Sequence, residues 1–170
     1  PLYSDIQGPF VLEEARRRHG NPKLRSSDIE MKDLFVAVKD YYLEPGPTKN
    51  LIDFCMNHQL SMTNLLLLGI RTYLSKVNNG QEDITIQNFI SRRSTHDEWT
   101  SGGSRTIMFP CRTVIAPETD FLSAAYEIQN MQNRIYMHSN YDPALIMDEM
   151  RKRYNTPEHT GYESCYLTYQ

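Results

Sequence analysis

The periodicity of the apolar residues changes near Gly80, and this change constrains the fold more than any other feature of the sequence. Before it, the apolar residues of Leu65–Val77 occupy most sides of a helical repeat, which predicts a buried helix. Asn78–Gly80 then forms a strong helix stop. After it, Asp83–Ile90 alternates between apolar and polar side chains, as a strand does. A buried helix followed by a strand indicates an α/β fold.

The remaining segments extend this pattern in both directions. Strands are expected over residues 34–38, 104–115 and 162–169, and further helices over residues 48–59, 119–138 and 143–154. The polar stretch 91–103 is expected to be a loop. Pro110 cannot donate to a strand ladder, so the strand that holds it should lie at a sheet edge or carry a bulge.

Capping residues set the expected helix ends. Thr48 is expected to cap the first helix, and Ser61 or Thr63 the second. Thr119 or Asp120 should open the long third helix, and Asp142 followed by Pro143 has the sequence of a cap and first helical position.

These elements give the order β-α-α-β-β-α-α-β and predict a layered α/β sandwich of a mixed sheet with helices. Residues 1–27 are polar and lack a sustained apolar period, so they are expected to form a connector with one short helix at most. Residues 28–170 are then expected to form one domain.

Composition excludes several classes of protein. Net charge is −3 and the basic residues are scattered, so no basic face is expected for nucleic acid. No apolar run reaches the roughly 18 residues of a membrane span. The three cysteines lie far apart without a CxxC pair, which favours a reducing, cytoplasmic compartment over a disulfide framework. The start at Pro1, the absence of a signal pattern and the end after a strand suggest a piece of a longer chain.

The sequence contains few of the residue patterns that are typical of catalytic sites. The five histidines are dispersed, and no metal-ligand spacing occurs, so no metal site is expected. The G-x-S-x-G, G-x-x-x-x-G-K-S/T and G-x-G-x-x-G patterns are all absent. His138 and Asp142 form an HxxxD, which the context favours as a helix end followed by a helix cap. Arg92–Arg93 leaves a strand and is either a solvated pair or part of a functional loop.

Four stretches resemble the condensation domains of nonribosomal peptide synthetases, relatives of the chloramphenicol-acetyltransferase-like acyltransferases. Residues 80–93 are similar to that family's G-x-x-D-I/V, strand, G-R pattern, with Arg92 at the usual glycine. Residues 103–112 resemble G-x-F-V-N-T-x-P-x-R, with Arg105 at the aromatic position and Ile107 at the asparagine. His138 matches the histidine of H-Q-D-x-P-F, with Pro143 one position late. Residues 162–170 are similar to the following aromatic strand. Together with the helix pair over residues 51–74, the resemblance covers about residues 30–170.

The resemblance implies a chloramphenicol-acetyltransferase-like lobe. In this family two such lobes enclose a tunnel, where carrier-protein-bound phosphopantetheine thioesters meet and an amide forms. The family's catalytic H-H-x-x-x-D-G lies in the amino-terminal lobe and is absent from this sequence. Residues 28–170 would therefore be an incomplete carboxyl-terminal lobe that holds no catalytic residue and binds no cofactor itself.

The resemblance also suggests site residues and partners. The candidates for the tunnel wall or for contact between lobes are Ser91, Arg93, Gly103, Arg112 and His138. The expected partners are carrier-protein domains and the amino-terminal lobe, with self-association through apolar surface left exposed by a missing lobe.

Three functions remain open at this stage. The parent domain could be a condensation enzyme or a related epimerisation or cyclisation domain. It could instead be a non-catalytic lobe that scaffolds or binds a carrier protein, in accord with Arg105 and Ile107 at the family's motif positions. A free-standing acyltransferase of the same fold that uses coenzyme A is the third alternative.

Overall fold

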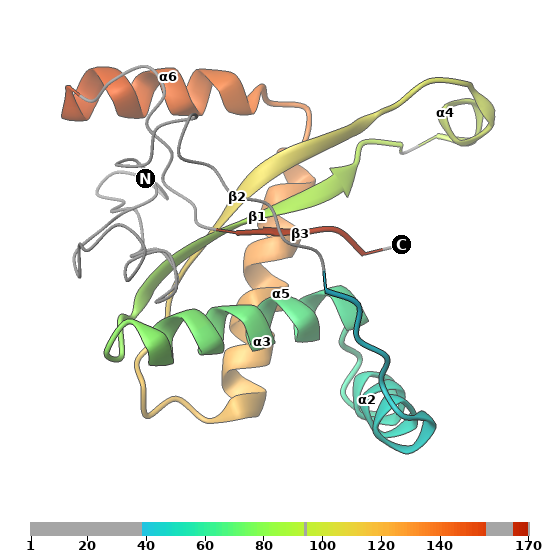
Figure 1. The fold of residues 1–170 in the computed structure, drawn as a ribbon. Coiled ribbons are helices and arrows are strands. Elements are labelled where there is room, and N and C mark those ends of the chain that lie inside the picture. The colour runs from blue at the N-terminus through green and yellow to red at the C-terminus, as the bar shows by residue number, and fades with distance from the viewer. Residues whose placement is uncertain (1–38, 94, 156–164, 170) are drawn as a thin grey trace.

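The computed structural model describes residues 39–93, 95–155 and 165–169. The expected connector over residues 1–27 and the expected strand over residues 34–38 lie outside this part of the chain. Within it, the elements run in the order α2, α3, β1, α4, β2, α5, α6 and β3. Figure 1 shows α5 crossing behind the strands, with α3 across its lower half and α6 above.

Two helices precede the sheet. Helix α2 spans Pro45–Asn57 and α3 spans Met62–Val77. The expectation that Thr48 caps the first helix was wrong, because Pro45 stands at its first position, where the fixed φ of proline suits a helix start, and Glu44 is the cap residue. Ser61 caps α3, since its side chain accepts a hydrogen bond from the Asn64 amide.

The central strands form an antiparallel hairpin. Strand β1, Asp83–Ser91, pairs with β2, Thr106–Val114, so that Gln87 lies opposite Pro110. Strand β3, Tyr166–Leu167, pairs in parallel with β1 on its other side, giving the order β2-β1-β3. Among the described strands β2 is therefore an edge, as Pro110 predicts. Of the strand expected over residues 162–169, two residues are paired in the described part.

The segment between β1 and β2 contains a short helix where a loop was expected. Residues 91–103 were expected to be a loop throughout, yet His96–Thr100 forms the short helix α4. Its start is a capping box, in which the Thr95 side chain accepts from the Glu98 amide and the Glu98 carboxylate accepts from the Thr95 amide. These local hydrogen bonds order a turn of helix that carries no apolar periodicity.

The last two helices begin as expected. Helix α5 spans Phe121–Met137 and is capped by Asp120, whose carboxylate accepts from the Ser123 amide. Helix α6 spans Pro143–Tyr154 and is capped by Asp142. No helix of the described residues is long and apolar enough to cross a membrane.

One apolar core joins α3 and α5 to the sheet. The buried apolar side chains at its centre are Leu67, Leu68, Leu74, Ile84, Ile86, Ile90, Phe109, Cys111, Ile115, Ala125 and Ile128. Helix α3 is buried on most sides, as its sequence predicts, although Tyr73 stays exposed. The face of β1 that holds Ile84, Ile86 and Ile90 also holds Asn88, which is equally buried. The core thus fixes the strand hairpin and leaves its α4 end projecting (Figure 1).

Candidate functional site

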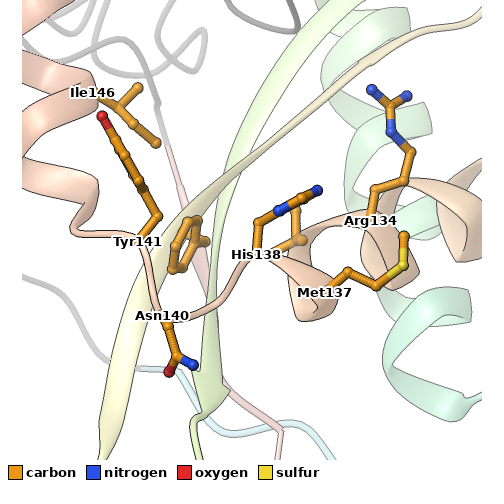
Figure 2. Close-up of a pocket in the computed structure, with 8 residues that line it drawn as sticks. Arg134, Met137, His138, Asn140, Tyr141 and Ile146 are labelled. Atoms are coloured by element: carbon orange, nitrogen blue, oxygen red, sulfur yellow. The ribbon is translucent and has the colours of Figure 1, made fainter.

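A cavity of about 470 Å³ opens where the end of α5, the start of α6 and strand β2 meet. The side chains that line it are Phe109, Arg134, Ile135, Met137, His138, Asn140, Tyr141 and Ile146. Figure 2 shows Tyr141 and Ile146 on one side of this cavity and His138, Met137 and Arg134 on the other. It therefore contains one of the five residues that the sequence suggested, His138.

A tight corner between two helices forms the wall of this cavity. His138 is the C-cap of α5, and its amide donates to the Ile135 carbonyl oxygen at 3.0 Å. The Tyr141 amide donates back to the His138 carbonyl oxygen at 3.0 Å. The Asp142 carboxylate accepts from the Ala144 amide at 2.9 Å, which confirms that Asp142 is a cap. The HxxxD motif is thus a structural corner that turns α6 back over the cavity.

The chemistry of the cavity is that of a binding surface. Four of its lining residues, Phe109, Ile135, Met137 and Ile146, are apolar. Arg134, His138 and Tyr141 bring hydrogen-bonding groups to this apolar surface. Such a surface suits a ligand with an apolar body and polar or negatively charged groups at its margin.

The described residues provide no activated nucleophile beside this cavity. Cys111 lies two residues beyond Phe109, and burial raises the pKa of its thiol to about 12. Burial likewise raises the pKa of Cys165 to about 11. Both thiols are therefore protonated near neutral pH and poorly nucleophilic. In the same part of the chain, no group of three or more His, Cys, Asp or Glu side chains could hold a metal ion.

Three other predicted site residues meet at the projecting end of the hairpin. The Arg93 guanidinium donates to the carbonyl oxygens of Glu98, Ser101 and Gly103, the second at 2.9 Å. The Arg93 amide donates to the Ser91 hydroxyl at 3.3 Å. Gly103 has a φ of +87°, which is costly for a residue with a side chain. Ser91, Arg93 and Gly103 thus belong to one hydrogen-bonded unit, which we call the arm tip.

The arm tip presents an aromatic residue that the sequence analysis missed. Trp99, the single tryptophan of the chain, lies on α4 with 66% of its surface exposed. An ion pair of 2.8 Å between Arg105 and Glu98 braces the same helix. The T-x-x-E pattern of Thr95 and Glu98 was the signal in the sequence that would have placed Trp99 on a helix.

The fifth predicted residue, Arg112, lies near the opposite end of the hairpin. Its guanidinium donates to both carboxylate oxygens of Asp83 at 2.9 and 2.8 Å. The two side chains are 9% and 25% exposed, so this is a partly buried, bidentate ion pair. The five residues therefore fall into three places, which are the arm tip, the Asp83–Arg112 pair and the cavity.

Replacing Arg93 with lysine is expected to loosen the arm tip without unfolding the domain. A lysine ammonium lacks the planar fork with which arginine spans several carbonyl groups, so the tip should lose about 1–2 kcal/mol of local stability. We expect faster limited proteolysis near α4, by about fivefold or more, and a change in acrylamide quenching of Trp99.

The matched control for this change is Arg92→Lys. Among the described residues, no side-chain hydrogen bond of Arg92 to the arm tip is seen and its buried Nε has no partner, so this substitution should leave both readouts unchanged. Equal effects of the two substitutions would show that the carbonyl contacts of Arg93 do not stabilise the tip.

Comparison with known proteins gives consistent matches. The family model described as "Condensation domain" matches residues 22–160. A plipastatin synthase of Bacillus subtilis (strain 168) is 24% identical over 109 residues, which are 64% of this chain and 4% of that protein. The chain therefore spans a small part of this curated relative.

Solved structures share the fold. The condensation domain from the Monacolin K polyketide synthase MokA matches with a TM-score of 0.60 at 15% identity, over 72% of this chain and 26% of that one. The first condensation domain of the calcium-dependent antibiotic synthetase, in complex with substrate analogue 3a, matches with a TM-score of 0.59 at 16% identity, over 75% and 28%. At these identities the likeness shows the fold, and it covers about a quarter of each solved chain.

Proposed function

Because the chain belongs to the condensation domain family, we propose that it is a carboxyl-terminal-lobe portion of a nonribosomal peptide synthetase condensation domain. The observation that carries this proposal is the family match over residues 22–160, together with a fold shared with solved condensation domains. In the complete domain the amine of one carrier-bound substrate attacks the thioester carbonyl of the other. An amide bond forms, the carbon–sulfur bond breaks and the thiol leaves with a proton.

The role of this segment is to bind and to shape the tunnel. It lacks H-H-x-x-x-D-G, so we propose no catalytic residue within it. The apolar cavity beside His138 supports this role, since it offers a surface for the apolar part of an acyl or aminoacyl group. The arm tip, with Ser91, Arg93 and Gly103, is the second candidate surface for the tunnel or for contact with the other lobe.

Large apolar side chains are exposed on several parts of the fold. Tyr42, Leu43, Met56, Trp99 and Met137 are each more than 60% exposed. Where exposed apolar side chains form a contiguous patch, such a patch is typical of a surface that another protein covers. We propose that carrier-protein domains and the amino-terminal lobe are these partners, that substrates arrive on phosphopantetheine, that the protein is cytoplasmic and that the isolated segment self-associates.

A non-catalytic scaffold lobe is the second candidate function, and two residues favour it. Arg105, at the family's aromatic position, is held by Glu98 in the ion pair at the arm tip. Ile107, at the family's asparagine position, packs against the apolar core. This fold thus accommodates both departures from the family pattern. This is what we expect of a lobe that has kept its structure but lost the residues that the family uses at these two positions.

Amide formation with loaded donor and acceptor carrier proteins tests the proposal. The present 170-residue chain is compared with the same chain extended upstream through the amino-terminal lobe. We expect activity in the extended chain alone. Inactivity of both chains with folding intact would favour the scaffold, and activity with an acyl-coenzyme A in place of the donor carrier would favour the free-standing acyltransferase.

A further inference from the structure

A second cavity, of about 230 Å³, lies at the other end of α5 from the His138 cavity. Its lining residues are Leu68, Arg71, Thr72, Ser75, Lys76, Gly80, Ile115, Ala116, Pro117, Thr119, Phe121 and Ala124. They come from α3, the turn that follows it, the connection between β2 and α5, and the first turn of α5. Figure 1 shows this connection passing the end of α3 before α5 begins. None of these residues takes part in the sites described above.

The cavity is lined by a buried cation, Arg71, which is 5% exposed. Its Nη2 donates to the backbone carbonyl oxygens of Glu82 and Ile115, the latter at 2.7 Å. Its Nε is buried and has no hydrogen-bond partner among the described residues. Nη2 of the guanidinium thus makes the contacts that tie α3 to the ends of β1 and β2.

In the described part of the chain, the carboxylates near Arg71 do not contact it. Burial lowers the pKa of the Arg71 guanidinium, and the charges of Glu127, Glu82 and Asp83 act in the opposite sense. Within the described part of the chain, no carboxylate forms an ion pair with Arg71, and Asp83 is bound by Arg112. A buried charge without a contacting counter-charge is costly, so a small anion that reaches it would be stabilised.

The rest of the cavity offers further groups that favour an anion. Lys76 is exposed and lines the cavity from α3, five residues beyond Arg71. Thr72, Ser75 and Thr119 bring hydroxyl donors. The first turn of α5 carries the positive end of a helix dipole, although the Asp120 carboxylate occupies its cap and binds the Ser123 amide. Two cations, three hydroxyls and a helix start therefore surround one small space.

We propose that this cavity binds a small oxyanion of the phosphate class between Arg71 and Lys76. The volume suits inorganic phosphate or the phosphate end of a larger compound. Arg71 is the inner contact and Lys76 the outer one, so occupation would join the carboxyl-terminal half of α3 to the start of α5.

Calorimetric titration of the 170-residue chain with inorganic phosphate tests this site, with sodium chloride holding ionic strength constant. We expect saturable binding with one phosphate per chain. Lys76→Gln should weaken binding at least about fivefold, because it removes a charge at the cavity mouth. The control Lys49→Gln removes an exposed charge on α2, which pairs with Asp53, and should leave the affinity unchanged.

Two further results separate the outcomes. Arg71→Lys keeps the positive charge and loses the planar, forked guanidinium, so this variant, provided that it folds, should no longer bind phosphate. Amide NMR shifts on phosphate addition should centre on Thr72, Ser75 and Thr119 in the wild-type chain. Three results would each overturn the proposal. Binding does not saturate when phosphate is in 50-fold excess over the protein, Lys49→Gln and Lys76→Gln weaken binding equally, or the amide shifts are confined to other residues.

Discussion

Asp83→Asn is expected to destabilise the fold by about 2–4 kcal/mol. The Arg112 guanidinium donates to both oxygens of the Asp83 carboxylate, and its own side chain is 9% exposed. The substitution keeps the shape of the side chain and removes its charge, so the largely buried Arg112 guanidinium loses the carboxylate to which it donates two hydrogen bonds. Loss of one partner of a fully buried pair costs about 3–5 kcal/mol, and the partial exposure of Asp83 lowers that figure. Urea denaturation measures the change in the free energy of unfolding.

A matched exposed pair supplies the control. Lys49 and Asp53 form an ion pair on the surface of α2, so Asp53→Asn should cost at most about 1 kcal/mol. Adding Arg112→Met to Asp83→Asn should restore part of the lost stability, because it removes the buried charge whose bidentate carboxylate partner has been neutralised. If Asp83→Asn costs no more than Asp53→Asn, the Asp83–Arg112 pair does not hold the ends of β1 and β2 together.

Gln132→Leu is expected to change stability in the opposite direction, by about 1–2 kcal/mol. Gln132 lies on the inner face of α5 and is 1% exposed. Neither its Oε1 nor its Nε2 has a hydrogen-bond partner among the described residues. A buried amide without partners carries a desolvation cost that an apolar side chain of similar size does not. The melting temperature and the urea midpoint should both rise.

The neighbouring Asn133 is the control for helix propensity. It is exposed on the same helix, so Asn133→Leu should stabilise by no more than about 0.5 kcal/mol. A loss of stability in Gln132→Leu would show that the Gln132 amide has hydrogen-bond partners in solution and is needed for the packing of α5.

Much of the fold was predictable because its signals are local. The apolar period of α3, the alternation of β1 and the caps at Ser61 and Asp142 involve residues within one or two turns of each other. The two wrong expectations, the Thr48 cap of α2 and the loop over residues 91–103, also concern local structure. Pro45 at the start of α2 and the capping box of α4 are also local features, and both are visible in the sequence.

The candidate sites were less accessible to the sequence. The family resemblance pointed to Ser91, Arg93 and Gly103, and the structure brings these three together at the arm tip. It separates them from Arg112 and His138, and whether any of the five lines the tunnel stays a prediction. Trp99 and the second cavity had no family motif to mark them.

The sequence by itself determined the family and the order of the described elements other than α4, because periodicity, caps and motif spacing are read along the chain. Only the tertiary structure decided which groups meet. Arg112 contacts Asp83 across 29 positions, and Arg71 contacts Ile115 across 44. The distance along the chain does not determine such contacts, since they depend on how α3 and α5 pack against the sheet. The same packing places Lys76 beside the start of α5 and His138 beside Phe109, and so creates both cavities.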